Sequence, residues 1–186
     1  MKDIVLCGFM GCGKSSIGKV AARKLAALTK ETEEEDLFCD LDDFVQEVSQ
    51  RSIKEIFEED GVDGFRQIEQ AALDSALMID SNLGRSRIIA LGGGTLLNPG
   101  CRTLVKENAI CIYLKAGIET LVKSLTDYPG ERPLLENDPR PLKGKIEDLL
   151  SERSPFYEEC ADLTIDTDGI DYFAIADEII AFIQNS

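Results

Sequence analysis

The amino-acid sequence predicts an α/β protein of three layers, in which a parallel sheet of five strands lies between helices. Short apolar runs rich in β-branched residues alternate with longer stretches of helical pattern. Such alternation is typical of strand–helix–strand units, whose crossover helices cover both faces of a parallel sheet. With 186 residues, 44% of them hydrophobic and 30% charged, the chain has the size and composition of one globular domain, residues 1–186.

Each element follows from its own pattern. Apolar runs predict the strands, which we place at residues 4–7, 37–39, 87–91, 109–114 and 163–165. Longer periodic stretches predict the helices at 14–27, 62–79 and 117–125. The C-terminal stretch has residues at a spacing near 3.6, namely Ile170, Phe173, Ala176 (or Asp177), Ile180 and Ile183, which predicts an amphipathic closing helix.

Two segments do not fit this alternation. The acidic run "TKETEEED" at 29–36 is typical of a solvated loop. The run "DYPGERPLLENDPRPL" at 127–142 holds four prolines, so it cannot continue a helix or a central strand. Long loops inside a compact domain are often functional. Because this one carries arginines, we expect a mobile lid at about 126–142.

Composition and charge exclude several classes of function. A net charge of −15 argues against nucleic-acid binding, which depends on surface cations. No apolar run approaches the length of a membrane span, and the first strand begins almost at Met1, so we expect a cytoplasmic protein without a targeting segment. The six cysteines form no C-x-x-C pair and are expected to be reduced and mostly buried. With no histidine in the chain, acid–base chemistry falls to carboxylates. We expect a monomer.

The stretch "VLCGFMGCGKSSIG" after the first strand contains the pattern G-x-x-x-x-G-K-[ST] at residues 8–15, which we call the phosphate loop. Glycines let backbone N–H groups turn toward phosphate oxygens, and the following helix presents its positive N-terminus. Lys14 is expected to reach the β and γ phosphates, and the Ser15 hydroxyl to bind Mg²⁺. The residues expected to bind ATP are Gly11, Cys12, Gly13, Lys14, Ser15 and Ser16.

The rest of the chain narrows the class of nucleotide-binding protein. A GTPase would need a guanine-reading N-K-x-D motif, which is absent. A transport or motor ATPase would carry an apolar strand ending in aspartate, whereas the third strand here ends in "LGGGT". A small kinase remains, with a core, an acceptor-binding segment at about 41–70 and a lid.

Further motifs supply candidate acceptor residues. In "FCDLDDF", Asp40 and Asp42 are two residues apart at the end of the second strand, so we expect them on the same side of it. In "GFRQIE", Arg66 and Glu69 are one helical turn apart and can pair. Taken singly, these residues could be a surface ion pair and a helix cap. The other candidates are Gly92, Gly93 and Gly94 of "LGGGT", Arg132 of "ERPLL" and Arg153 of "ERSPFY".

In order and spacing, these motifs resemble the shikimate kinase family over nearly the whole chain. The resemblance implies a P-loop NTPase fold with strand order 2-3-1-4-5. It also implies transfer of a phosphoryl group from ATP, with Mg²⁺, to the 3-hydroxyl of shikimate, a step of aromatic amino acid biosynthesis. By the same resemblance, Asp42 binds the ring hydroxyls and acts in catalysis with Lys14 and Arg132. Arg132 also binds ATP, closing over the transferring phosphate. The carboxylate of shikimate is held by Arg66, Gly93 and Arg153, and Asp40 assists the metal ion.

The chain departs from the family pattern in two places. The acidic run at 29–36 is an insertion, expected to leave the site intact. Leu125 stands near the position where the family carries a cation that stacks on adenine, and Lys123 is the nearest cation. Two alternatives stay open at this point: a kinase for another hydroxy acid such as gluconate, and a degenerate domain that binds nucleotide without turnover. Against the second, Lys14, Ser15 and Asp42 are all present.

Overall fold

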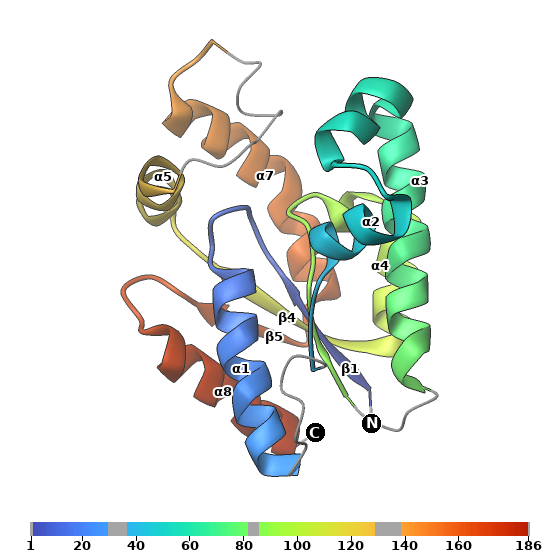
Figure 1. Ribbon diagram of the computed structural model, residues 1–186. Helices are drawn as coiled ribbons and strands as arrows, with labels where there is room; N and C mark the ends of the chain where they lie inside the picture. Colours follow the sequence, from blue (N-terminus) through green and yellow to red (C-terminus); the bar gives the residue numbers. More distant parts are fainter. Residues whose placement is uncertain (1, 30–36, 82–85, 129–138, 186) are drawn as a thin grey trace.

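The computed structural model describes residues 2–29, 37–81, 86–128 and 139–185 (Figure 1). Its centre is a parallel sheet in the order β2-β3-β1-β4-β5, as predicted. The strands are β1 (Asp3–Cys7), β2 (Phe38–Asp40), β3 (Ile88–Ala90), β4 (Ala109–Lys115) and β5 (Leu163–Asp166). The central strand β1 pairs with β3 on one side and β4 on the other, so the phosphate loop that follows it leaves the middle of the sheet.

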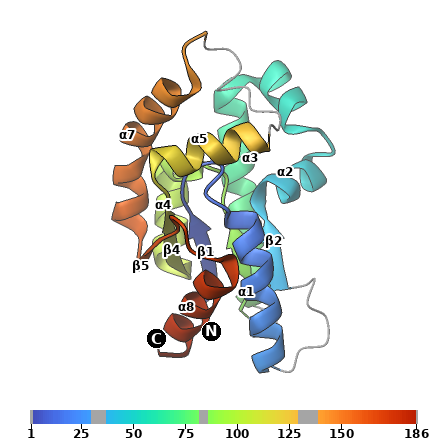
Figure 2. The ribbon, with the colours of Figure 1, turned by 90° about the vertical axis from the view of Figure 1, so that its left-hand side faces the viewer.

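Helices cover both faces of the sheet. They are α1 (Lys14–Thr29), α2 (Leu41–Ser49), α3 (Ile53–Ser81), α4 (Pro99–Asn108), α5 (Ile118–Asp127), α7 (Leu142–Cys160) and α8 (Tyr172–Asn185), with a 3₁₀ turn η2 (Thr95–Leu97). Helices α1 and α8 lie side by side on one face, and α3 and α4 lie on the other (Figures 1 and 2). Among the described helices, none combines the length and the apolar character that a membrane crossing requires.

Alternate residues of each strand feed two separate cores, because successive side chains of a strand point to opposite faces. Ile4 and Leu6 pack with residues of α1, α5 and α8, whereas Val5 and Cys7 pack with residues of α2, α3, α4 and α7. All four of these side chains are buried. A strand that is apolar at every position is what a sheet covered on both faces requires.

Three helices that the sequence pattern did not predict are present: α2, α4 and α7. Helix α2 has only nine residues, too few for its periodicity to stand out. Helix α4 carried a usable signal, since Asn98 caps it through a 2.8 Å hydrogen bond from the Gly100 N–H and proline follows at the first helical position. Helix α7 contains Pro155 in its interior, which argued against a helix there.

Two predicted helices have different limits in the structure. Helix α3 begins at Ile53 and not at Val62, although its backbone is non-helical at Gly61 (φ 71°), so the predicted segment is a helix of its own beyond that kink. Helix α8 begins at Tyr172, and the predicted apolar side was wrong at its start, since Ile170 and Phe173 are exposed. The buried residues of α8 are Ile175, Ala176, Ile179 and Ile180.

The cysteine prediction is confirmed. All six thiols are free, and all but Cys39 are buried. By contrast, most of the predicted lid and of the acidic run lies outside the described residues. Only their edges are described: Thr29 ends α1, 126–128 close α5, and 139–142 lead into α7.

Candidate active site

The carboxyl ends of β1, β2 and β3 meet at one edge of the sheet, where parallel α/β proteins bind ligands. A cavity of about 330 Å³ opens there between the phosphate loop, α2, α3, the loop after β3 and α7. Ten of the predicted site residues line it: Gly11, Lys14, Ser15, Asp40, Asp42, Arg66, Gly92, Gly93, Gly94 and Arg153. Folding therefore brings together residues that are up to 142 positions apart in the sequence (153 − 11).

The phosphate loop has the backbone that its glycines predict. Gly11 and Gly13 have φ values of 83° and 93°, in the left-handed region that favours glycine. The Lys14 ammonium is buried and donates to the carbonyls of Gly8 (3.0 Å) and Phe9 (2.9 Å), so its charge is held inside the loop. Predicted ligands Cys12, Gly13 and Ser16 belong to this loop and the first turn of α1 but are not among the residues that line the cavity.

A pair of oxygen groups lies beside the loop. The Ser15 hydroxyl donates to Asp40 Oδ2 at 2.5 Å. Both are hard oxygen donors of the kind that Mg²⁺ prefers, and this ion commonly uses one or two protein ligands together with water and phosphate oxygens. No group of three or more histidine, cysteine, aspartate or glutamate residues that could hold a metal occurs in the described part of the chain. The donor set therefore fits Mg²⁺ brought by a nucleotide.

Asp40 and Asp42 both reach the cavity, but by a different route from the predicted one. Only Asp40 belongs to β2; Asp42 lies in the first turn of α2. Asp40 is the residue that caps this helix, since its Oδ1 accepts from the Asp42 N–H at 3.1 Å. The expectation that both project from the same side of a strand was therefore wrong, and a helix start places the second carboxylate instead.

Asp42 has the environment of a carboxylate with unusual acid–base behaviour. Burial raises its pKa to about 6, helped by the negative charges of Asp40 and Glu69 and opposed by the positive charge of Lys14. A group with a pKa in this range can exchange a proton near neutral pH. Carboxyl groups with perturbed pKa values are common in active sites, so Asp42 is a candidate catalytic residue.

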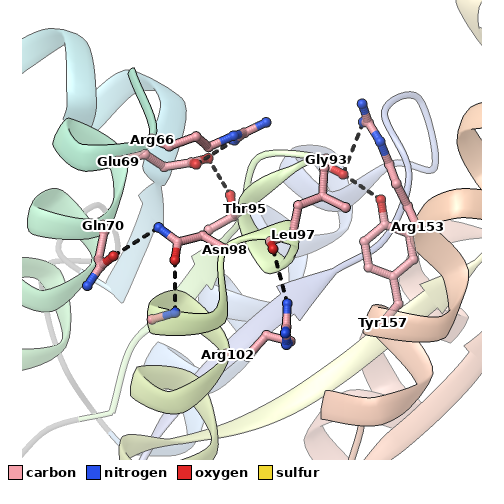
Figure 3. A network of polar contacts seen from close by, with 11 residues as sticks. Arg66, Glu69, Gln70, Gly93, Thr95, Leu97, Asn98, Arg102, Arg153 and Tyr157 are labelled. Carbon is pink, nitrogen blue, oxygen red and sulfur yellow. Dashed lines mark hydrogen bonds and ion pairs between the residues drawn. The ribbon is translucent and has the colours of Figure 1, made fainter. Parts of the chain in front are cut away.

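Arg66 and Glu69 pair as predicted, and the pair belongs to a larger network (Figure 3). Arg66 Nη1 lies 2.5 Å from Glu69 Oε2, and the Thr95 hydroxyl donates to Glu69 Oε1 at 2.6 Å. Glu69 is 1% exposed. A buried carboxylate with two donors holds the Arg66 guanidinium at the wall of the cavity, so the pair is more than a surface ion pair.

The three glycines after β3 allow close approach of charged groups. A Cβ atom at Gly92 would lie 2.8 Å from Asp42 Oδ1, and one at Gly94 would overlap the Arg66 guanidinium. On the far wall, Arg153 is 3% exposed and its Nη1 donates to the Gly93 carbonyl at 3.3 Å. Arg66 and Arg153 thus face one cavity from α3 and α7, separated by the glycine turn.

Further positions bear on the nucleotide side of the site. Arg132 lies outside the described residues. Leu125 is buried and would contact a Cβ at Gly11 at 3.1 Å, so it packs under the phosphate loop. Lys123 is 80% exposed and pairs with Asp127. Tyr172 is half-exposed and lies near the loop, with its hydroxyl 3.3 Å from a Cβ placed on Gly13.

The cavity also has an apolar wall that the sequence reasoning missed. Phe57 and Phe65 stack with ring centroids 4.5 Å apart and line the cavity beside Arg66. Both belong to the same stretch as the predicted arginine, "IFEEDGVDGFRQIE". Their position on either side of the Gly61 kink was the available signal, since the bend folds the first part of α3 over the second.

Comparison with known proteins agrees with this geometry. The shikimate kinase family model matches residues 10–184. The shikimate kinase of Caldanaerobacter subterraneus subsp. tengcongensis is 37% identical over 181 residues, covering 97% of this chain and 95% of that protein. The shikimate kinase of Legionella pneumophila (strain Corby) is 35% identical over 183 residues, covering 98% and 95%.

A solved structure gives the same result in three dimensions. Shikimate kinase from Acinetobacter baumannii in complex with shikimate matches with a TM-score of 0.82 and 30% identity, covering all of this chain and 94% of that one. The family match spans the phosphate loop lysine, the cavity carboxylates and both arginines. The chain belongs to the shikimate kinase family.

Proposed function

We propose that this protein transfers the γ-phosphoryl group of ATP to the 3-hydroxyl of shikimate, giving shikimate 3-phosphate and ADP. One observation carries the proposal: Arg66, Arg153 and the half-buried carboxylate of Asp42 face the phosphate loop across a single cavity. A polyhydroxylated ring with one carboxylate matches these groups.

The acceptor would be held at both of its chemical ends. Guanidinium groups grip carboxylates through paired, charge-assisted hydrogen bonds, so Arg66 and Arg153 take the shikimate carboxylate with the Gly93 backbone. Asp42 accepts hydrogen bonds from the ring hydroxyls. The acceptor-binding segment at about 41–70 supplies Asp42 and Arg66, and Phe57 and Phe65 cover the apolar part of the ring.

The nucleotide would lie along the phosphate loop, with Lys14 on its β and γ phosphates. Ser15 and Asp40 would hold Mg²⁺, which neutralises charge on these phosphates when bound. Arg132 remains a prediction from the sequence, as the cation that closes over the transferring group from a lid at about 126–142.

Catalysis would come from positioning and charge neutralisation. Asp42 orients the acceptor hydroxyl and accepts its proton as the new oxygen–phosphorus bond forms. The bond from the γ phosphorus to the bridging oxygen of ADP breaks in the same step, and Lys14 stabilises the charge that collects there. The pKa of Asp42 near 6 suits this role, because the carboxylate is ionised at neutral pH but still takes a proton readily.

A monomer in the cytoplasm, without nucleic-acid partners, is part of the same proposal. Free thiols are typical of reducing compartments, and a net charge of −15 opposes binding to phosphate backbones. Size-exclusion chromatography with light scattering would test the monomer directly, since a dimer would have twice the chain mass of 20.5 kDa.

The activity is tested by coupling ADP formation to NADH oxidation with MgATP and one of three additions: shikimate, gluconate or buffer. We expect turnover with shikimate at least about a hundred times faster than with gluconate, because a site with fixed polar partners rejects an acceptor that leaves them unpaired. Equal rates of ADP formation in all three would indicate an ATPase. Faster turnover with gluconate than with shikimate would indicate a kinase for another hydroxy acid. No turnover in the presence of tight ATP binding would indicate a degenerate domain.

A further inference from the structure

The Gly93 carbonyl accepts two hydrogen bonds from α7 (Figure 3). The Tyr157 hydroxyl donates to it at 2.5 Å, and Arg153 Nη1 donates to it at 3.3 Å. The Tyr157 bond is the shorter of the two, so the phenol is the nearer donor to this oxygen. The two donors lie one helical turn apart on the same face of α7.

Arg153 keeps donors free for another group. Its Nε is buried and has no hydrogen-bond partner among the described residues. Its guanidinium lies 5.7 Å from the centroid of the Phe9 ring, a contact that holds the group in place without using its N–H groups. A buried donor without a partner is costly, so the guanidinium is better satisfied when a ligand carboxylate accepts from its N–H groups.

The glycine turn also contacts the phosphate loop. A Cβ at Gly93 would lie 3.1 Å from the Met10 backbone nitrogen, so the two loops are in direct contact. The turn is held on its other side by the Thr95 hydroxyl, which donates to Glu69. Movement of the Gly93 carbonyl would therefore displace the wall between the acceptor and the nucleotide.

We propose that Tyr157 is a positioning residue for the acceptor, acting through Gly93 and Arg153. By satisfying the Gly93 carbonyl, the phenol leaves the Arg153 guanidinium free to bind the carboxylate of the acceptor. Without the hydroxyl, Arg153 becomes the sole side-chain donor to this half-buried oxygen, and the guanidinium shifts toward Gly93 and away from the cavity. The inference rests on the proposed function, since it assigns the carboxylate grip to Arg153.

The test is Tyr157→Phe, with Tyr113→Phe as its matched control. Tyr113 is equally buried and packs on Tyr157 with ring centroids 5.2 Å apart, but within the described residues its hydroxyl has no hydrogen bond. We expect Tyr157→Phe to raise both the KM and the calorimetric Kd for shikimate roughly tenfold, the loss expected for one hydrogen bond to a charged or buried group. The KM for ATP should change less than about twofold, as should every constant of Tyr113→Phe.

A double-mutant cycle with Arg153→Ala separates positioning from a general structural role. If Tyr157 acts through Arg153, adding Tyr157→Phe to Arg153→Ala leaves the Kd for shikimate unchanged. A further tenfold loss in the double variant would overturn the proposal, as would an unaltered Kd in the single variant. An equal rise in both KM values with a fall in Tm would show a structural role only. If the wild-type protein does not phosphorylate shikimate, the proposed function is overturned. If the wild type turns over shikimate normally and Tyr157→Phe binds it with an unchanged Kd, only this inference is rejected.

Discussion

The Asp42 carboxylate lies against the backbone of Gly92, so close that a Cβ there would be 2.8 Å from Oδ1. The same Cβ would be 3.1 Å from Glu69 Oε1 and from Thr95 Oγ1. Three oxygens from α2, α3 and η2 therefore converge on one residue that has no side chain. The absence of a side chain at position 92 is what lets the two carboxylates share one wall of the cavity.

Gly92→Ala should consequently lower kcat/KM for shikimate by about a hundredfold, since the methyl group displaces the Asp42 carboxylate by several tenths of an ångström or more. It should also reduce the free energy of unfolding by about 1–3 kcal/mol, as overpacking does. Steady-state kinetics and urea denaturation measure the two effects. The matched control is Gly144→Ala in α7, where a Cβ meets nothing within 4 Å and alanine favours the helix. Wild-type kinetics in both variants would show that position 92 tolerates a side chain.

The pH dependence of activity should report the ionisation of Asp42. Because the carboxylate form is needed, kcat/KM for shikimate should fall below a pKa of about 6. Glu69→Gln removes one of the negative charges that raise this pKa, so its acidic limb should move to lower pH. The measurement is a pH–rate profile with excess coupling enzymes. A wild-type profile that is flat between pH 5 and 7 would contradict the role of Asp42.

Because the charged Asp42 carboxylate is unfavourable in its partly buried position, Asp42→Asn should be more stable than the wild type at neutral pH. The pKa is about 6 in the folded protein and 3.8 for an ordinary aspartate, so between these values the folded state holds the proton more tightly. Its contribution to stability is therefore lost as pH rises from about 4 to about 6. The advantage of Asp42→Asn in unfolding free energy should grow over that interval by up to about 3 kcal/mol and then level off. An advantage independent of pH would reject this explanation.

Lys14→Met should abolish turnover while leaving the fold intact. The ammonium is buried within the phosphate loop. Its hydrogen bonds to the carbonyls of Gly8 and Phe9 fix its position where the β and γ phosphates are expected to bind. Circular dichroism should be unchanged and kcat should fall by at least about a thousandfold, which corresponds to about 4 kcal/mol of transition-state stabilisation. Lys19→Met, farther along α1, is the control, since its ammonium instead lies 5.7 Å from the Phe38 ring centroid. Near-normal turnover at saturating MgATP would remove the kinase assignment of Lys14.

Arg66→Ala should weaken shikimate binding selectively. Loss of a charge-assisted pair costs about 1.5–3 kcal/mol, so the KM for shikimate should rise about ten- to a hundredfold with little change in that for ATP. Arg51→Ala is a suitable control, because Arg51 pairs with Glu59 and Asp60 at the kink of α3, outside the cavity. Substrate titrations of both variants measure the difference. Equal rises in the two KM values of Arg66→Ala would assign it a structural role.

Much of the fold could be predicted because strand and helix patterns are local. The runs at Ile4 and Ile88 are apolar at every position, which a strand buried on both faces requires, and the phosphate loop has glycines where the backbone adopts positive φ. Helices α2 and α7 were not predicted, for two different reasons. The first is too short to show a period, and the second contains a proline that the surrounding helix tolerates.

The sequence by itself determined the chemistry of the site: which residue types are present, that Lys14 follows a glycine loop, and that Arg66 and Glu69 share a helical face. Only the tertiary structure decided how these groups act together. Ser15 meets Asp40, and Tyr157 meets Gly93, through contacts between elements far apart in the chain. The raised pKa of Asp42 likewise depends on burial and on charges from other elements. Distances of this kind and desolvation arise from packing, which no local pattern encodes.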